Sequence, residues 1–126
     1  MHLVNPIVLP DDLSVGHYAA EIIFTELVKA KSDGRTFVLG CPGGRTPRST
    51  YNALATMITA AKQDISHLII AMMDEYLQEN GDGTFSNHSE EKHFSCARFA
   101  KLEIFNVLNA GAPDGGKIPA ENVRFP

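Results

Sequence analysis

The sequence has little of several features that mark particular classes of protein. Its two cysteines, Cys41 and Cys96, are too few for a disulfide scaffold and are spaced like no zinc-binding motif. No apolar run approaches the ~20 residues that span a bilayer, and the opening MHLVNPIVLPDD lacks the basic start of a signal peptide. The net charge of −4 argues against neutralisation of nucleic-acid phosphates. We therefore expect a cytoplasmic protein without nucleic-acid or membrane partners.

The sequence does contain an ordered alternation of helical and strand-like segments. Its 126 residues, 44% hydrophobic and 21% charged, fit one globular domain over residues 1–126. The apolar spacing predicts helices over residues 13–31, 46–63 and 89–111, and strands over residues 36–40, 67–73 and 122–126. The Gly-, Asp- and Asn-rich stretch 74–87 is predicted to be an irregular loop. This order is typical of an α/β fold with parallel strands and covering helices.

The apolar positions also predict which side of each helix faces the core. For the first helix these positions are Leu13, Tyr18, Ala19, Ile22, Ile23, Leu27 and Val28. For the second helix they are Tyr51, Leu54, Ala55, Ile58 and Ala61. For the third helix they are Phe94, Ala97, Leu102, Phe105 and Leu108, with Asn87 or Ser89 as the N-cap.

The first candidate site is the glycine-rich turn GCPGGRTP, between the first predicted strand and the second predicted helix. Gly43 and Gly44 supply the backbone angles of a tight turn, Thr46 is a candidate helix cap, and Pro47 suits the first helical position. Free N–H groups at a helix start attract anions, and Arg45 adds positive charge. The register excludes a P-loop, and no G-x-G-x-x-G fingerprint is present. Taken alone, the turn fits an anion site or a simple change of direction.

The second candidate site is MMDEY, where Asp74 and Glu75 directly follow the second predicted strand. A carboxylate at a strand end suits proton transfer, because partial burial raises its pKa toward the working pH. The alternative is that Asp74 starts a turn and Glu75 is solvated. Ligand sites of parallel sheets lie outside the carboxyl ends of the strands. We therefore expect this stretch and the glycine turn to open onto the same edge of the sheet.

Together the two stretches resemble a known family. GCPGGRTPRSTYNAL is similar to the G-x-P-x-G-x-T-P-x-x-x-Y-x-x-L stretch of glucosamine-6-phosphate deaminases, and MMDEY is similar to their N-M-D-E-Y. The related 6-phosphogluconolactonases have a G-G-S-x-P turn and usually D-E-R, so Tyr76 favours the deaminase side. HFSCARFAKLEIFNVL and IPAENVRF resemble the next helix and strand approach of the family more loosely.

The resemblance implies an open, mainly parallel, Rossmann-like sheet with helices on both faces, and activity on a phosphorylated sugar. The backbone amides of Gly43, Gly44, Arg45 and Thr46 would hold the phosphate. Asp74, with Glu75 as the second catalytic candidate, would move a proton between C1 and C2 of the open-chain sugar. No metal or organic cofactor is implied, and His88 and His93 are interpreted as surface histidines.

The chain departs from the family pattern in three ways. Arg45 replaces a small serine, and Met72 replaces the asparagine before M-D-E-Y. The family is also about twice as long, and its G-x-D-G-H-type motif for ring opening has no counterpart here. We therefore expect the N-terminal part of the family fold, inactive on its own and prone to associate as a homo-oligomer or to be partly disordered. The alternatives are a non-catalytic sugar-phosphate-binding module and a lactone hydrolase of the 6-phosphogluconolactonase type.

Overall fold

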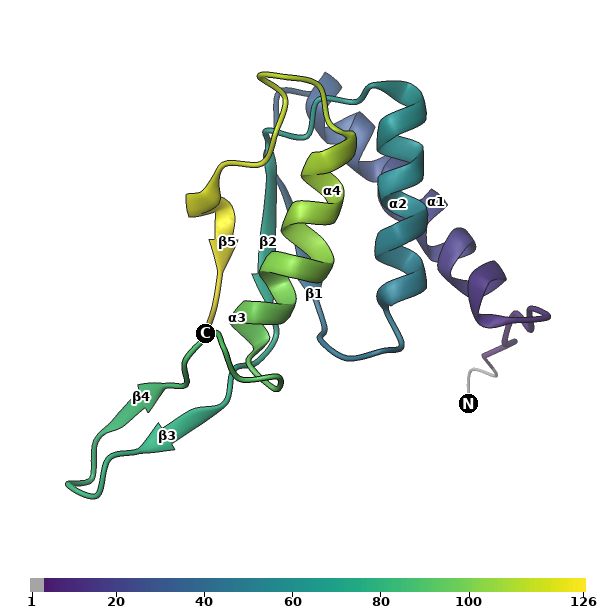
Figure 1. Ribbon diagram of the computed structural model, residues 1–126. Helices are drawn as coiled ribbons and strands as arrows, with labels where there is room; N and C mark the ends of the chain where they lie inside the picture. The colour runs from purple at the N-terminus through teal and green to yellow at the C-terminus, as the bar shows by residue number, and fades with distance from the viewer. Residues whose placement is uncertain (1–3) are drawn as a thin grey trace.

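The chain folds as alternating helices and strands, which confirms the α/β prediction (Figure 1). The computed structural model describes residues 4–126. The helices are α1 (Asp12–Ser32), α2 (Arg48–Ala61), α3 (Cys96–Phe99), the π-helix η1 (Ala100–Phe105), α4 (Asn106–Gly111) and the 3₁₀ turn η2 (Ala120–Asn122). The strands are β1 (Phe37–Cys41), β2 (Leu68–Met72), β3 (Leu77–Glu79), β4 (Phe85–Asn87) and β5 (Val123–Arg124). The three strands predicted from the sequence correspond to β1, β2 and β5.

The main sheet has three parallel strands in the order β1-β2-β5. The register places Cys41 opposite Met72, so β1 and β2 end side by side. Ile70, in the middle strand β2, pairs with Val123 of β5. Because parallel strands point the same way, the segments that follow β1 and β2 leave the sheet at one edge.

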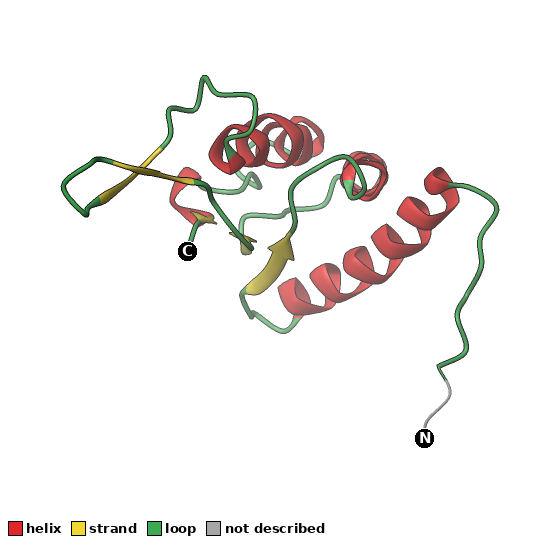
Figure 2. Ribbon diagram, turned by 90° about the horizontal axis from the view of Figure 1, so that it is seen from below, coloured by secondary structure: helices red, strands yellow, loops and turns green. Residues whose placement is uncertain are grey.

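Within residues 4–126, helices cover one face of this sheet. Side chains alternate between faces along a strand, and Leu68, Ile70 and Met72 of β2 are buried toward the helices. On the opposite face Val38 is 60% exposed, and a Cβ atom built on Gly40 would meet no atom within 4 Å. Figure 2 shows the long helices on the same side of the strands. The expectation of helices on both faces is therefore not met by the described residues.

The buried residues of helix α1 are mostly small, and they bring the helix close to α2. The Asp11 carboxylate caps the helix by accepting a hydrogen bond from the Ser14 N–H, at 2.7 Å. Its buried residues are Gly16, Ala20, Leu27 and Ala30. A Cβ atom on Gly16 would lie 2.5 Å from the Ser49 Oγ of α2, so the backbones approach closely. Of the predicted inward residues, Leu27 is buried and Ala19, Ile23 and Val28 are partly buried. Leu13, Tyr18 and Ile22 are exposed, so the predicted face is only partly correct.

The segment predicted as an irregular loop contains an antiparallel hairpin, formed by β3 and β4 and projecting from the rest of the chain (Figure 1). Gly81 and Gly83 have φ values of 81° and 84°, and the Asn80 N–H donates to the Thr84 carbonyl at 3.0 Å. All six strand residues are exposed. A hairpin with both faces in solvent carries no apolar alternation, and this explains why the sequence pattern missed it.

The third helical segment begins later than predicted, at Cys96, where Ser95 rather than Asn87 or Ser89 is the N-cap. The Ser95 Oγ accepts from the Arg98 N–H at 3.2 Å. The segment continues through η1, whose π-helical turns are wider than α-helical ones. Its buried residues recur every four positions: Cys96, Ala100, Ile104 and Leu108. Of the predicted inward residues, Leu108 is buried, whereas Phe94 and Leu102 are exposed because of the later start and the wider turns.

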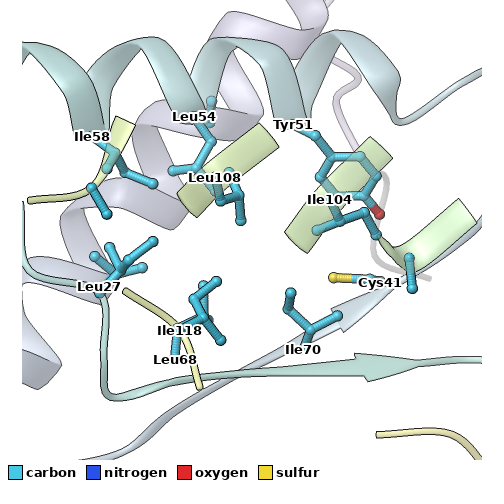
Figure 3. Close-up of a cluster of buried hydrophobic side chains, with 14 of the residues drawn as sticks. Leu27, Cys41, Tyr51, Leu54, Ile58, Leu68, Ile70, Ile104, Leu108 and Ile118 are labelled. Carbon is cyan, nitrogen blue, oxygen red and sulfur yellow. The ribbon is translucent and has the colours of Figure 1, made fainter. Parts of the chain in front are cut away.

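The core lies between the sheet and the helices. Figure 3 shows buried side chains from every layer meeting in one cluster, among them Leu27 of α1, Leu54 of α2, Ile70 of β2 and Ile104 of η1. Burying an aliphatic side chain of this size stabilises the fold by about 1.5–3 kcal/mol. Across residues 4–126, no helix has both the length and the apolar character needed to cross a membrane.

Candidate functional site

The segments that follow β1 and β2 meet in one pocket of about 600 Å³. The two strands end together, and the Met73 N–H donates to the Cys41 carbonyl at 3.3 Å. Three segments form the walls of the pocket. From the turn after β1 and the start of α2 they contribute Pro42, Gly43, Gly44, Arg45 and Arg48; from the stretch after β2, Met73, Asp74 and Tyr76; and from the approach to α3 and its first turn, His93, Phe94, Ser95, Cys96 and Phe99.

The turn after β1 presents backbone amides to this pocket. Gly44 has φ 91°, a conformation that favours glycine, whereas Gly43 has no positive φ and space for a Cβ atom. Within the described chain, no acceptor binds the N–H groups of residues 43–46. The Tyr51 hydroxyl of α2 donates to the Pro42 carbonyl at 2.8 Å and so fixes the start of the turn.

The start of α2 differs in detail from the prediction. The helix begins at Arg48 with Pro47 as its N-cap, and no side chain caps it. Thr46 is therefore not the cap, and it does not line the pocket. The Arg48 N–H donates to the Arg45 carbonyl at 3.3 Å, which closes the turn. The uncapped start keeps the positive end of the helix dipole directed at the turn.

Two arginines, Arg45 and Arg48, give the pocket positive charge. Arg45 is exposed, and within residues 4–126 no carboxylate forms a salt bridge with it. Arg48 forms a salt bridge with Glu103 of η1 at 3.1 Å, and its guanidinium lies 6.0 Å from the centre of the Phe99 ring. Arg45 is thus available to a bound anion, whereas Arg48 is held at the wall by its partner.

Asp74 and Glu75 are adjacent in the chain but lie in different places. Asp74 lines the pocket, is exposed, and accepts no hydrogen bond from the described part of the chain. Glu75 does not line the pocket. Its Oε1 accepts from the Tyr76 and Cys96 N–H groups, both at 2.9 Å, and its Oε2 accepts from the Ala97 N–H at 2.7 Å. Burial raises the pKa of the Glu75 carboxyl, but these backbone hydrogen bonds outweigh burial and lower its pKa below the usual value.

The pocket therefore brings together four of the six site residues predicted from the sequence: Gly43, Gly44, Arg45 and Asp74. Thr46 and Glu75 lie outside its lining.

Sequence reasoning missed an aromatic group on the third wall. Phe94 packs edge-to-face with Tyr76, His88 and His93, at ring-centre distances of 6.0, 4.9 and 5.3 Å. His93 also lines the pocket. The sequence pattern predicts that Phe94 faces the core on a helix and that His88 and His93 are surface histidines, so it does not place them in this pocket. No local pattern in the sequence marks this cluster, because it forms only when Tyr76 comes close to Phe94.

The two cysteines are both free, and neither has the properties of a nucleophile. Burial raises the pKa of the Cys41 thiol to about 11. For Cys96 burial, followed by the negative charges of Glu75 and Asp74, raises the thiol pKa to about 11. Both side chains therefore remain protonated thiols near neutral pH.

The donor set gives no sign of a metal centre in the part of the chain that the structure describes, where no three His, Cys, Asp or Glu residues cluster as metal ligands do. Compared with models of known protein families, the chain matches none. The geometry of the site thus offers backbone amides and an arginine for an anion, and a carboxylate for proton transfer.

Proposed function

We propose that this chain binds a phosphorylated amino sugar such as glucosamine 6-phosphate, and that its pocket is of the glucosamine-6-phosphate deaminase/isomerase type. One observation carries the proposal. The turn residues Gly43, Gly44 and Arg45 and the Asp74 carboxylate, about thirty residues apart in sequence, open onto the same pocket. Isomerisation of a phosphorylated sugar needs both an anion site and a group that transfers protons.

The phosphate would lie at the turn. The amides of Gly44 and Arg45 would donate to its oxygens, and the Arg45 guanidinium would add a charge-assisted hydrogen bond. Gly44, with φ 91°, has no side chain that could cover the amides of the turn. The anchored phosphate then orients the carbon chain of the sugar, so that binding energy from a remote group positions the reacting carbons.

The Asp74 carboxylate would act on the open-chain sugar. It would take the proton from one of the two carbons C1 and C2 and return it to the other, through an enediol-type intermediate. Its place in the pocket lining, just after the end of β2, fits a base that reaches a substrate held by its phosphate. No cofactor is needed for such a proton shift.

A second candidate is a module that binds the sugar phosphate without chemistry. The observation that favours it is the freedom of Asp74, which is exposed and accepts no hydrogen bond from residues 4–126. A general base is usually oriented by a hydrogen bond to a neighbouring group. Arg45 in the turn is compatible with both candidates.

Calorimetric titration tests the phosphate site. We expect glucosamine 6-phosphate to bind about tenfold or more tightly than unphosphorylated glucosamine, because charge-assisted hydrogen bonds contribute about 1.5–3 kcal/mol. Arg45→Met should remove most of this preference. The matched control is Arg35→Met, because Arg35 pairs with Asp33 at 3.1 Å at the other end of β1. Equal affinity of the wild-type chain for both sugars would contradict the proposed function.

Isotope exchange separates the two candidates. The chain is incubated with glucosamine 6-phosphate in D₂O, and deuterium at C2 is followed by NMR. The catalytic candidate predicts exchange that Asp74→Asn abolishes while leaving sugar-phosphate binding intact. Binding without any exchange in the wild-type chain would favour the non-catalytic module. Unchanged exchange in Asp74→Asn would remove Asp74 from the mechanism.

A further inference from the structure

The three hydrogen bonds of Glu75 join parts of the chain that are far apart in sequence. Tyr76, Cys96 and Ala97 all donate to this one carboxylate. Cys96 lies 21 residues beyond Glu75, so the carboxylate closes the whole intervening segment, including the β3–β4 hairpin, into a loop. Closing a flexible loop of that length costs conformational entropy, and charge-assisted hydrogen bonds are strong enough to offset that cost.

Helix capping alone does not account for this arrangement. The start of α3 already has a local cap, since the Ser95 Oγ accepts from the Arg98 N–H at 3.2 Å. What Glu75 adds is a connection between the end of β2 and the start of α3. That connection holds two walls of the pocket, one containing Asp74 and the other containing Phe94 and Cys96.

Glu75 also determines where its neighbour can lie. Asp74 lines the pocket, whereas the carboxylate of the next residue is bound to the Cys96 and Ala97 amides outside the lining, so fixing Glu75 restricts where Asp74 can lie. The same hydrogen bonds bring Tyr76, the residue after Glu75, close to Phe94, with ring centres 6.0 Å apart. The placement of Asp74 and the contact between Tyr76 and Phe94 both require that residues 74–76 and 94–97 keep their relative positions.

We propose that Glu75 is a positioning residue of the pocket. Its carboxylate locks the stretch after β2 onto the start of α3 and thereby holds Asp74 and the Phe94 wall in place. The role of Asp74 in this inference rests on the function proposed above. The locking of the two walls does not, and it can be measured without any ligand.

The ligand-independent test uses NMR contacts between aromatic rings. We expect Glu75→Ala to lose the nuclear Overhauser contacts between Tyr76 and Phe94. The core pair Tyr51 and Phe99, with ring centres 6.4 Å apart, should keep its contacts and so report that the variant is folded. Glu75→Gln keeps one side-chain oxygen as an acceptor, so the Tyr76–Phe94 contacts should be weakened rather than lost. Unchanged contacts between Tyr76 and Phe94 in Glu75→Ala would overturn the proposal.

The ligand-dependent test compares the affinity for glucosamine 6-phosphate. Wild type, Glu75→Gln and Glu75→Ala should bind progressively more weakly, with a total loss on the order of tenfold to 100-fold, the size expected when one charge-assisted hydrogen bond to the ligand is lost. The control is Asp11→Asn, which alters a carboxylate cap of the same kind on α1, away from this pocket. If Glu75→Ala loses no more affinity than Asp11→Asn, Glu75 acts only as a helix cap, and the proposal is overturned.

The two tests distinguish failure of this inference from failure of the proposed function. If the wild-type chain does not bind glucosamine 6-phosphate, the proposed function fails, and the ring contacts alone decide the role of Glu75. If the wild-type chain binds and the ring contacts of Glu75→Ala are unchanged, the inference fails and the proposed function stands.

Discussion

Two helix starts lie side by side at the same edge of the sheet, and they are treated differently. At α3 the protein supplies its own acceptors, with Glu75 bound to the Cys96 and Ala97 amides and Ser95 bound to the Arg98 amide. At α2 no side chain caps the helix, and the amides of the preceding turn have no acceptor within the described chain. The amides at the start of α3 are thus bound by side chains of the protein, whereas those before α2 are free to bind a ligand.

The difference shows where the chain can accept an external anion. Free N–H groups at a helix start carry partial positive charge and require an acceptor. A carboxylate that belongs to the protein meets this requirement at α3. At α2 the requirement is left to water or to a ligand, and Arg45 adds charge at the same place. The contrast between a filled and an open helix start is therefore the basis of the proposed phosphate site.

The largest effect on stability is expected from Gly16→Ala, because the added methyl group would clash with the first turn of α2. The added Cβ atom would lie 2.6 Å from the Ser49 carbonyl carbon, in the first turn of α2. Overpacking of this kind costs about 1–3 kcal/mol, more than the better helix propensity of alanine recovers. Urea unfolding measures the loss. The control is Gly40→Ala, where a Cβ atom meets nothing within 4 Å; equal stability of Gly16→Ala and wild type would contradict the packing.

The next effect is expected from Gly44→Ala, which alters the turn itself. With φ at 91°, an L-residue is strained there by about 1–2 kcal/mol. The strain can be relieved only if the turn rearranges, so the affinity for glucosamine 6-phosphate should fall as well. Gly43→Ala, at a position with space and no positive φ, should retain its stability. Equal losses in the two variants would show that the turn does not depend on the conformation of Gly44.

A smaller effect, dependent on pH, is expected at the filled helix start. At neutral pH Glu75→Gln should cost about 1 kcal/mol, because a charge-assisted acceptor is replaced by a neutral one. The pKa of Glu75 is lowered in the folded state, since the hydrogen bonds from Cys96, Tyr76 and Ala97 outweigh the burial that raises it. Its contribution is therefore complete above the unfolded pKa and declines as the pH falls through the folded pKa.

Urea unfolding of wild type and Glu75→Gln between pH 7 and pH 3 measures this contribution. The difference in unfolding free energy between the two proteins should be largest near pH 7 and should shrink in the acidic range. A difference that stays constant over the whole pH range would mean that Glu75 does not act through its charge.

The smallest effect is expected from Glu103→Gln, which releases Arg48 beside the open helix start. The side chains of Arg48 and Glu103 are 47% and 37% exposed, so breaking their salt bridge should cost less than about 0.5 kcal/mol. The freed guanidinium stays at the pocket wall and should tighten glucosamine 6-phosphate binding slightly. Thermal unfolding and calorimetric titration measure the two effects. Weaker binding would indicate that Glu103 orients Arg48 for the ligand.

The sequence predicts well the parts of the fold that depend on local periodicity. The strands over residues 36–40 and 67–73 match β1 and β2 within about one residue, and the helix over residues 46–63 contains α2. The two candidate stretches are placed at one edge of the sheet because strand order and direction decide this. Gly44 is also identified, since a tight turn restricts the residue types that fit.

The sequence fails where a residue acts across a long separation. Glu75 is interpreted as a second catalytic carboxylate, because no local rule reveals that it binds amides 21 and 22 residues away. The start of α3 is misplaced for the same reason, since one of its caps comes from another part of the chain. The predicted inward face of α1 is only partly correct, because Gly16 and Ala20 allow a close approach to α2 and small residues carry little weight in an apolar pattern.

The central claim is that the helix start of α2 is open to a phosphate while that of α3 is filled. The most direct measurement is an NMR titration of the amide resonances with glucosamine 6-phosphate, with unphosphorylated glucosamine as the control. We predict saturable shifts of the Gly44, Arg45 and Thr46 amides with the phosphorylated sugar only, and smaller shifts of the Cys96 and Ala97 amides, which keep their Glu75 acceptor. Absence of shifts at residues 44–46, or equal shifts with both sugars, would contradict the account.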